Sequence, residues 1–365
     1  MTIIKDIESS QDTARGAVLL GTGGGGDPYV GELFLRKQLA AGKYPRIVSV
    51  DDLADDAFVV TVAGIGAPTV LVEHLLSEAA LTSLLGEAEG FYKRTIDALI
   101  CAEIGGANAM LPLAVGAITG IPVVDGDGIG RAFPHLEMTT FSINGCSASP
   151  GILADDLGNL ATIHAIDNRA TNVMVRALTG ALGACLYGVL YPMTGAEIKR
   201  VAVRGTVTQA LEIGREIRLA RERSPDPVSD VVRFLDELEE ERCSKLLFQG
   251  KVIDVTHETR DGFHWGQVTV ESLGGSRDTL TIQVQNEFIA ARLGERVLAT
   301  VPDLICVLDS ETAEPMTAEM LRYGARIAVI ALSASPALCT PRALEVVGPR
   351  QFGLDMDWQP LDRMQ

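Results

Sequence analysis

The sequence predicts a layered α/β N-terminal domain with a mostly parallel sheet, followed by a smaller all-β domain that is either a barrel or a sandwich. Up to about residue 125, apolar runs alternate with segments whose apolar residues follow helical spacing, which is typical of a layered α/β domain. From about Lys245 the apolar residues shift towards strict alternation, and turn residues separate the short runs. A chain of 365 residues, with 47% hydrophobic and 22% charged residues, is long enough for two such domains.

In the first domain, each apolar run predicts a buried strand and each amphipathic segment predicts a helix. The expected strands are Ala17 to Leu20, Arg46 to Val50, Ala57 to Ala63, Ala98 to Ala102 and Pro122 to Val124. The expected helices are Tyr29 to Ala41, Val70 to Gly86 and Asn108 to Ala117. Because parallel strands place ligand sites outside their carboxyl ends, the loops that follow these strands are the first candidates for a binding site.

Helices are expected at the end of the first domain and in the connector that follows it. The segment Asn168 to Met193 is apolar and rich in small residues, and it predicts one or two core helices. Its stretch Leu178 to Met193 is too short and too rich in glycine for a membrane span, so a buried helix is expected there. Thr194 and Glu197 have capping-box spacing at the start of a mixed-charge helix, which the prolines of residues 224–227 end. A second helix with an acidic face follows.

Alternating apolar residues in the second domain predict a series of short strands. These are Leu247 to Val255, Trp265 to Glu271, Leu280 to Gln285, Arg296 to Val301, Ile305 to Leu308 and Arg326 to Leu332. We therefore expect an α/β domain with the active site over residues 1–195, a helical connector over 196–244, a β-rich domain over 245–340, and a C-terminal segment over 341–365 that returns to the first domain.

A glycine-rich stretch is the strongest local signal in the chain. Gly23, Gly24, Gly25 and Gly26 can adopt positive φ and let the backbone lie close to a ligand, while Asp27 and Pro28 suit the N-cap and the first position of the next helix. A strand, a glycine loop and a helix N-terminus would together form a cradle for an anion or a polar ligand. The alternative interpretation is a tight turn whose glycines only permit close packing.

The same stretch also matches the dinucleotide-binding fingerprint. Gly21, Gly23 and Gly26 have the required spacing, which keeps an NAD(P)-dependent oxidoreductase as an alternative function. A carboxylate at Asp27 would compete with a pyrophosphate for the helix N–H groups, and this argues against that alternative.

Two strand-end loops carry carboxylates that suit acid–base chemistry. Asp125 and Asp127 flank a glycine, and such carboxylates can orient a water, accept ring N–H donors or bind a divalent ion. The alternative for this pair is an Asx turn. Glu103 can transfer a proton, while Asn108 can either recognise an amide-like group or cap the next helix.

Two basic residues follow the aspartates. The planar fork of Arg131 fits a substrate carboxylate. His135 suits a general base or a ligand, and the alternative is a packed or solvated residue without a role in the site. Both are counted among the substrate-binding candidates.

Composition and charge exclude several classes of protein. A net charge of −17 makes nucleic acid a poor partner, and six scattered cysteines give neither a disulfide framework nor a thiolate zinc site. The N-terminus lacks the basic and apolar regions of a secretory signal, so we expect a cytoplasmic protein. Its expected partner is a small-molecule substrate, and no membrane association is expected. The spacing of His, Cys, Asp and Glu residues does not indicate a metal site. The sequence identifies no cofactor, although the carboxylates could bind a divalent ion. It does not decide whether the protein forms a homo-oligomer.

Several motifs together resemble one bacterial family. They are residues 20–29, Glu103–Gly106 with Asn108, Val124–Pro134, Met193–Arg200, Gln285–Glu287 and Gly348–Arg350. In the same order, and from about residue 15 to 357, they resemble the family named for S-methyl thiohydantoin desulfurase, whose members are associated with hydantoin utilisation. The resemblance implies an N-terminal α/β domain, a C-terminal β-domain, and a reaction in which water replaces a methylthio group on a hydantoin-like ring.

The sequence therefore predicts a hydrolase of a hydantoin-like or S-methyl thiohydantoin-like ring. The expected catalytic residues are Asp127 or Glu103, which would position water, together with Asp125. Asp125 and Asn108 would hold ring N–H and C=O groups, and Arg131 or the N–H groups of Gly23 to Gly26 would bind a side-chain carboxylate. A non-catalytic partner of a hydantoin-processing enzyme is a further alternative.

Overall fold

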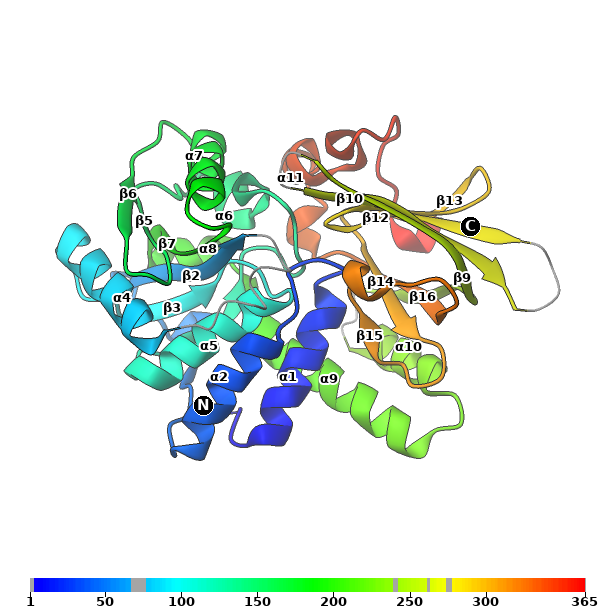
Figure 1. Ribbon diagram of the computed structural model, residues 1–365, viewed down its shortest axis with the longest axis horizontal. Coiled ribbons are helices and arrows are strands. Elements are labelled where there is room, and N and C mark those ends of the chain that lie inside the picture. Colours follow the sequence, from blue (N-terminus) through cyan, green and yellow to red (C-terminus); the bar gives the residue numbers. More distant parts are fainter. Residues whose placement is uncertain (1–2, 67–76, 239–241, 261–262, 274–277, 365) are drawn as a thin grey trace.

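The computed structural model describes residues 3–66, 77–238, 242–260, 263–273 and 278–364. An α/β part and an all-β part lie side by side, so the predicted fold class is confirmed (Figure 1). Of the expected helix Val70 to Gly86, residues 70–76 lie outside the described residues, and its second half belongs to α4 (Glu78–Tyr92). No helix in the described part of the chain is both long and apolar enough to span a membrane.

In the described part of the chain, sheet A of the N-terminal part has eight strands, which form a parallel half and an antiparallel half. The parallel half contains, in spatial order, β1 (Ile47–Ser49), β4 (Val123–Asp127), β3 (Ala98–Cys101) and β2 (Phe58–Gly66). The antiparallel half continues from β2 with β7 (Cys185–Thr194), β5 (Gly151–Ala154) and β6 (Leu160–Ile163), while β8 (Val203–Arg204) pairs with β4. The carboxyl ends of the parallel strands lead into the loops that carry the candidate residues.

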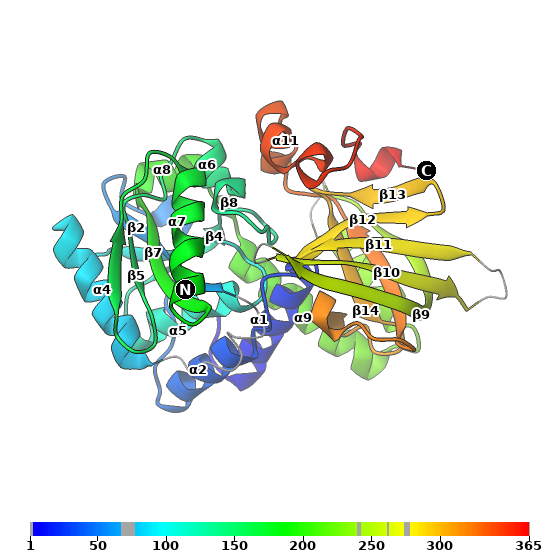
Figure 2. The ribbon, with the colours of Figure 1, turned by 45° about the horizontal axis from the view of Figure 1, so that its top comes forward.

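Helices cover both faces of sheet A (Figures 1 and 2). α5 (Ala107–Thr119) packs on β2 and β3, and α2 (Tyr29–Ala40) packs outside α5. α7 (Asn168–Ala181) and α8 (Gly195–Val201) cover the other face. The short α6 (Thr140–Ile143) lies beside α8.

The structure corrects two predicted elements of this part. Ala17 to Leu20 is the last turn of α1 (Ile7–Leu20), not a strand; a capping box between Asp6 and Ser9 starts this helix, and its apolar side is buried. Cys185 to Thr194 is the strand β7 and not a buried helix. β7 lies between β2 and β5 and is buried on both faces, so its sequence is a continuous apolar run that periodicity alone does not distinguish from a helix.

The helix predicted after Thr194 starts at the expected residue but is shorter than predicted. Thr194 and Glu197 form the capping box of α8, but this helix ends at Val201, and the mixed-charge segment forms the separate helix α9 (Thr206–Arg223). α10 (Pro227–Glu237) follows with Pro227 in its first turn.

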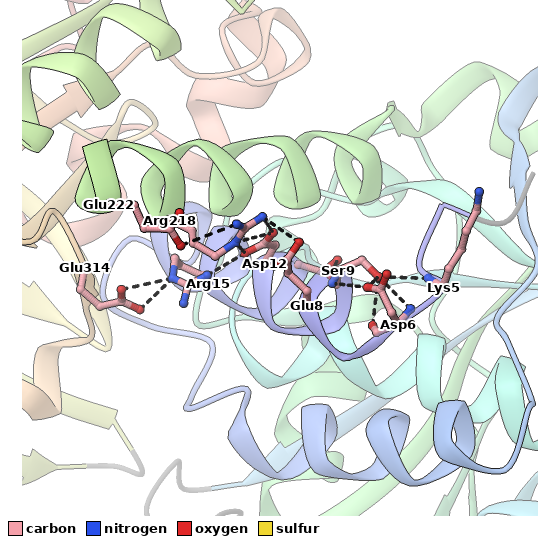
Figure 3. Close-up of polar contacts among 10 residues, drawn as sticks. Lys5, Asp6, Glu8, Ser9, Asp12, Arg15, Arg218, Glu222 and Glu314 are labelled. Atoms are coloured by element: carbon pink, nitrogen blue, oxygen red, sulfur yellow. Dashed lines mark hydrogen bonds and ion pairs between the residues drawn. The ribbon is translucent and has the colours of Figure 1, made fainter. Parts of the chain in front are cut away.

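α1 and α9 pack in unusually close contact because glycines lie where they cross. A Cβ atom on Gly16 would lie 1.8 Å from the Ala210 carbonyl oxygen, and one on Gly214 would lie 1.7 Å from the Asp12 carbonyl oxygen. Next to the crossing, the buried Asp12 carboxylate accepts bonds from Arg218 (Nη2–Oδ2 2.9 Å) and Arg15 (Nη1–Oδ1 2.8 Å) (Figure 3). Arg15 also binds Glu314 at 3.0 Å, which ties α1 to the C-terminal part.

Within its described residues, the C-terminal part is built on one antiparallel sheet of eight strands. In spatial order they are β13 (Arg296–Thr300), β12 (Glu287–Leu293), β11 (Thr279–Gln285), β10 (Phe263–Ser272), β9 (Ser244–Arg260), β16 (Arg326–Leu332), β14 (Leu304–Asp309) and β15 (Pro315–Met316). β12 and β13 approach β14, so the sheet curls around an apolar core. β12 was not predicted from the sequence, because its apolar residues are consecutive and do not alternate with polar ones.

The C-terminal segment contacts both parts of the protein. α11 (Pro341–Val347) packs beside α6, and the ring of Phe352 stacks on Phe133 with a centroid distance of 5.8 Å. Trp358 Nε1 donates to Asp303 Oδ2 at 2.8 Å, which fixes the end of the chain to the β-rich part.

The α1–α9 crossing gives a stability prediction. Gly16→Ala would push a methyl group into the α9 backbone, and we expect it to lower the free energy of unfolding by about 1–3 kcal/mol, measured by urea denaturation. Gly86→Ala is the matched control: Gly86 lies in α4 with open space around its Cβ position, so this change should stabilise by about 0.5–1 kcal/mol. Equal effects of both changes would contradict the close crossing.

Candidate functional site

A cavity of about 140 Å³ lies where the two parts of the protein meet. Its walls come from the glycine-rich loop, the end of β2, the loop between β3 and α5, the segment 129–139, α7, and the turn between β11 and β12. The polar side chains that line it are Glu103, Asn108, His135, Thr139, Asn172, Arg176, Asn286, Glu287 and Glu319. The cavity therefore combines carboxyl, amide, imidazole and guanidinium groups from both parts.

The glycine-rich loop connects two helices and lies between the two parts of the protein. Gly106 N donates to Ala17 O and Ala107 N donates to Gly25 O, while Phe288 N donates to Thr22 O from the other part. Gly25 has φ +75°, and a Cβ there would lie 2.7 Å from the Gly105 backbone. Close packing therefore explains why residue 25 is glycine, which agrees with the interpretation of this stretch as a tightly packed turn.

The same loop also faces the cavity. Gly24, Gly25 and Gly26 line it, whereas a Cβ atom on Gly23 would lie 2.6 Å from the Phe288 ring. Asp27 and Pro28 do not take the predicted N-cap and first helical positions, because Pro28 is the N-cap and α2 begins at Tyr29. Asp27 is exposed, and its Oδ1 accepts from Tyr29 N at 2.9 Å. Because a helix and not a strand precedes the glycines, the structural context that a dinucleotide fingerprint requires is missing.

Glu103 and Asn108 meet inside the cavity. Asn108 Nδ2 donates to Glu103 Oε1 at 2.8 Å, and Asn108 Oδ1 accepts from Gly64 N at 2.8 Å, so the amide bridges the end of β2 and the carboxyl. Within the described ranges, Glu103 Oε2 accepts one long bond, from Phe133 N at 3.4 Å. Burial raises the pKa of Glu103 to about 7, against the lowering effect of Asn108. This carboxyl can exchange a proton near neutral pH.

Asp127 lies beneath the cavity wall and does not line it. Its fully buried carboxyl accepts from Ile104 N at 2.8 Å, from Ile129 N at 3.1 Å and from Gly130 N at 2.8 Å. It therefore joins the loop that carries Glu103 to the loop that follows β4. Burial raises the pKa of Asp127 to about 7, although these N–H donors act to lower it.

Asp125 points away from the cavity to the start of α9. Its Oδ1 accepts from Val207 N and Thr208 N, each at 3.0 Å. These are N–H groups of the first helical turn, which have no partner within the helix. The structure therefore places Asp125 as a cap for α9 and does not bring it together with Glu103.

Arg131 is fully buried and also lies outside the cavity. Its guanidinium donates to the carbonyl oxygens of Pro302 at 2.9 Å and Asp303 at 2.8 Å, and to Thr22 Oγ1 at 2.8 Å. The Phe133 ring, which lines the cavity, stacks over the guanidinium at 4.2 Å. Arg131 thus connects the glycine-rich loop to the β-rich part and helps to hold the Phe133 ring in the cavity wall.

His135 lines the cavity and rests on α7. Asn172 Nδ2 lies 3.1 Å from His135 Nδ1, with the other amide atom of Asn172 facing Leu136 N. Burial lowers the pKa of His135 to about 4, and the nearby Arg176 and Arg169 lower it further. The imidazole is therefore neutral at pH 7, and with Nδ1 accepting from the amide its Nε2 carries the proton.

The sequence analysis did not single out several cavity residues as candidates. Asn172 and Arg176 belong to α7, where helical periodicity gives no sign of a cavity. Glu287 is buried, with 2% of its surface exposed, and was only quoted within the motif Gln285–Glu287. That motif was the one available signal, because nothing else distinguishes a glutamate in an apolar strand.

Among the described residues, no three His, Cys, Asp or Glu side chains are grouped so that they could hold a metal ion. Asp27 lines a separate cavity of about 30 Å³ that shares Asn108 and Gly64 with the larger one.

These features define a two-part protein, with a carboxyl-lined cavity between an α/β layer and a curled antiparallel sheet. The chain belongs to the S-Me-THD-like family: residues 8–165 match its N-terminal domain and residues 166–361 match its C-terminal domain. A crystal structure of a protein from Chromobacterium violaceum is similar over 98% of this chain and 99% of that chain, with 25% sequence identity and a TM-score of 0.81. No curated protein matches the chain.

Asp127→Asn should destabilise the protein. An asparagine offers one oxygen instead of two and turns an NH₂ group towards backbone donors, so we expect the free energy of unfolding to fall by about 1–3 kcal/mol. Thermal melting measures this change. Asp51→Asn, at an exposed position, is the control, and an unchanged melting temperature for Asp127→Asn would contradict the role of the carboxyl in joining the two loops.

Proposed function

We propose that the protein hydrolyses a hydantoin-like ring, with water replacing the methylthio group of an S-methyl thiohydantoin or attacking a ring amide. The proposal is carried by the position of Glu103 in the cavity wall, where one carboxyl oxygen makes only a long bond. Burial at this position raises its pKa to about 7. Membership of the S-Me-THD-like family supports the choice of ring. A protein that performs this reaction is a hydrolase.

Glu103 has the properties of a general base for this reaction. A base whose pKa lies near the working pH is both ionised and basic enough to take a proton from water. Its Oε1 is occupied by Asn108, which leaves Oε2 for the attacking water. Asn108 also orients the carboxyl, because its own oxygen is bound by Gly64 N.

Neutral donors in the cavity suit the charge that develops on the ring. Addition of water makes the ring nitrogen or oxygen more negative, and hydrogen-bond donors placed there stabilise the transition state. His135 Nε2–H and the amide of Asn172 are donors from one wall of the cavity. In this proposal Asp127 is a positioning residue, because it holds Ile104 N next to Glu103.

The function is tested by incubating the protein with S-methyl thiohydantoins, thiohydantoins and hydantoins and measuring methanethiol or ring-opened product. Turnover is expected, and Glu103→Gln should lower kcat/KM by about 10²–10⁴-fold, since it removes the general base. Glu87→Gln, on the exposed side of α4, is the matched control. A wild type that neither turns over nor binds any of these rings would refute the function.

The pH dependence gives a second test. The carboxyl of Glu103 is protonated and inactive below its pKa of about 7 and ionised above it. We expect kcat/KM to rise tenfold per pH unit well below pH 7 and to level off above it, and Glu103→Gln should remove this rise. A rate that is flat between pH 5 and 8 would exclude Glu103 as the base.

A further inference from the structure

Glu287 is held in the cavity wall by its own backbone. β11 ends at Gln285 and β12 begins at Glu287, and these two residues are paired directly, so Asn286 alone makes the turn with φ +58°. Asn286 N donates to His264 O at 2.7 Å, and Asn286 Oδ1 accepts from His264 N at 2.8 Å. Asparagine tolerates this left-handed conformation better than most residues. The turn therefore fixes the direction of Glu287.

The Glu287 carboxyl has an oxygen without a protein partner. Oε2 is buried and makes no hydrogen bond within the part of the chain that the structure describes, although the residue lines the cavity. A buried polar atom of this kind is costly unless a ligand or water satisfies it. The unpaired Glu287 Oε2 therefore indicates that a ligand group binds there.

Gly24 is a glycine because of this carboxyl. A Cβ atom on Gly24 would lie 2.1 Å from Glu287 Oε1, and its nearest neighbours are all Glu287 side-chain atoms. Unlike Gly23, Gly25 and Gly26, Gly24 has no positive φ, so its backbone conformation does not require glycine. The glycine-rich loop and β12 thus leave room for the carboxyl between them.

The charges around Glu287 favour its protonated form. Burial raises the pKa of Glu287 well above its usual range, and the carboxyls of Glu103 and Glu319 raise it further, while Arg131 lowers it. Arg176 on α7 also lies within electrostatic range. The direction of these effects favours a Glu287 carboxyl that keeps its proton, in the same cavity as Glu103, whose pKa is about 7.

We propose that Glu287 is the proton donor of this site and acts on the ring nitrogen of a cyclic S-alkyl thioimidate. The proposal rests on the function proposed above and adds one residue to it: Glu287 gives a proton to the ring nitrogen as water adds to the neighbouring carbon. A ring that offers only a permanent cation at this position would not be a substrate.

The proposed steps balance. The water oxygen bonds to the thioimidate carbon while Glu103 takes one water proton and Glu287 gives its proton to the ring nitrogen. The C–S bond then breaks, and the leaving methanethiolate takes the proton from Glu103. The remaining hydroxyl proton passes to the Glu287 carboxylate as the C=O bond forms. The products are the hydantoin and methanethiol, and both carboxyls return to their starting states.

Infrared difference spectroscopy tests the protonated state without substrate. At pH 8 the wild type should show the C=O stretching band of a protonated carboxyl, which Glu287→Gln lacks and Glu87→Gln keeps. Absence of this band from the wild type, or its survival in Glu287→Gln, would overturn the proposal.

A double-mutant cycle tests the contact with Gly24. We expect Gly24→Ala to lower the melting temperature and to reduce kcat at least tenfold in the wild-type background, because its methyl group displaces the carboxyl. In the Glu287→Ala background the added methyl group should leave the melting temperature unchanged. Gly86→Ala is the control in both backgrounds. Equal shifts in both backgrounds would show that Gly24 does not contact Glu287.

Kinetics separate donation of a proton from a structural role. Wild-type kcat/KM on an S-methyl thiohydantoin should fall again at high pH as Glu287 ionises, and Glu287→Gln should lower kcat about a hundredfold and remove this alkaline limb. If the wild type is active but Glu287→Gln keeps the limb, only the donor role is overturned. If the wild type turns over none of the rings, the proposed function fails and the donor role fails with it.

Discussion

The buried guanidinium of Arg131 is the interaction on which the rest of the site depends. It is among the largest fully buried side chains, and its donors reach Thr22 in the glycine-rich loop and the carbonyl groups of Pro302 and Asp303 in the β-rich part. A buried cation is tolerated only when its N–H groups are satisfied, so both segments must be in place together. The cavity between them therefore forms only when the two parts of the chain have docked.

Close backbone contacts also hold the segments around the cavity in fixed positions. The glycine-rich loop touches the loop after β3 through Gly25 and Gly106, and it touches β12 through Gly23 and Gly24. Asp127 adds a third connection by accepting N–H groups from two loops at once. The backbone segments that carry Glu103 and Glu287 are thus fixed by close contacts, and the Asn108 amide in addition orients the Glu103 carboxyl.

Glu103 and Asn108 are among the candidate residues that line the cavity, and both were predicted from a local signal. Glu103 and Asn108 were predicted because they follow a strand whose apolar run is unambiguous. Ala17 to Leu20 and Cys185 to Thr194 were misassigned because short apolar runs lack a period, and tertiary packing decides their conformation. Asp127 accepts Ile129 N and Gly130 N within its own loop, which is the Asx turn that the sequence offered as the alternative. Asp125, in contrast, binds the start of α9, 82 residues away, and Glu287 reaches the cavity from the other part of the chain, so no local pattern shows either placement.

The pairing of α1 with α9 has a consequence for synthesis of the chain. Asp12 and Arg218, which bind each other across this crossing, are 206 residues apart. At the usual pace of translation, α1 leaves the ribosome roughly 10–40 s before its partner helix exists. During that interval the apolar side of α1 has only nearer elements such as α2 and α5 to cover it. A nascent chain that halts before residue 206 therefore exposes a helix face that chaperones recognise, and premature release at that length yields an aggregation-prone fragment.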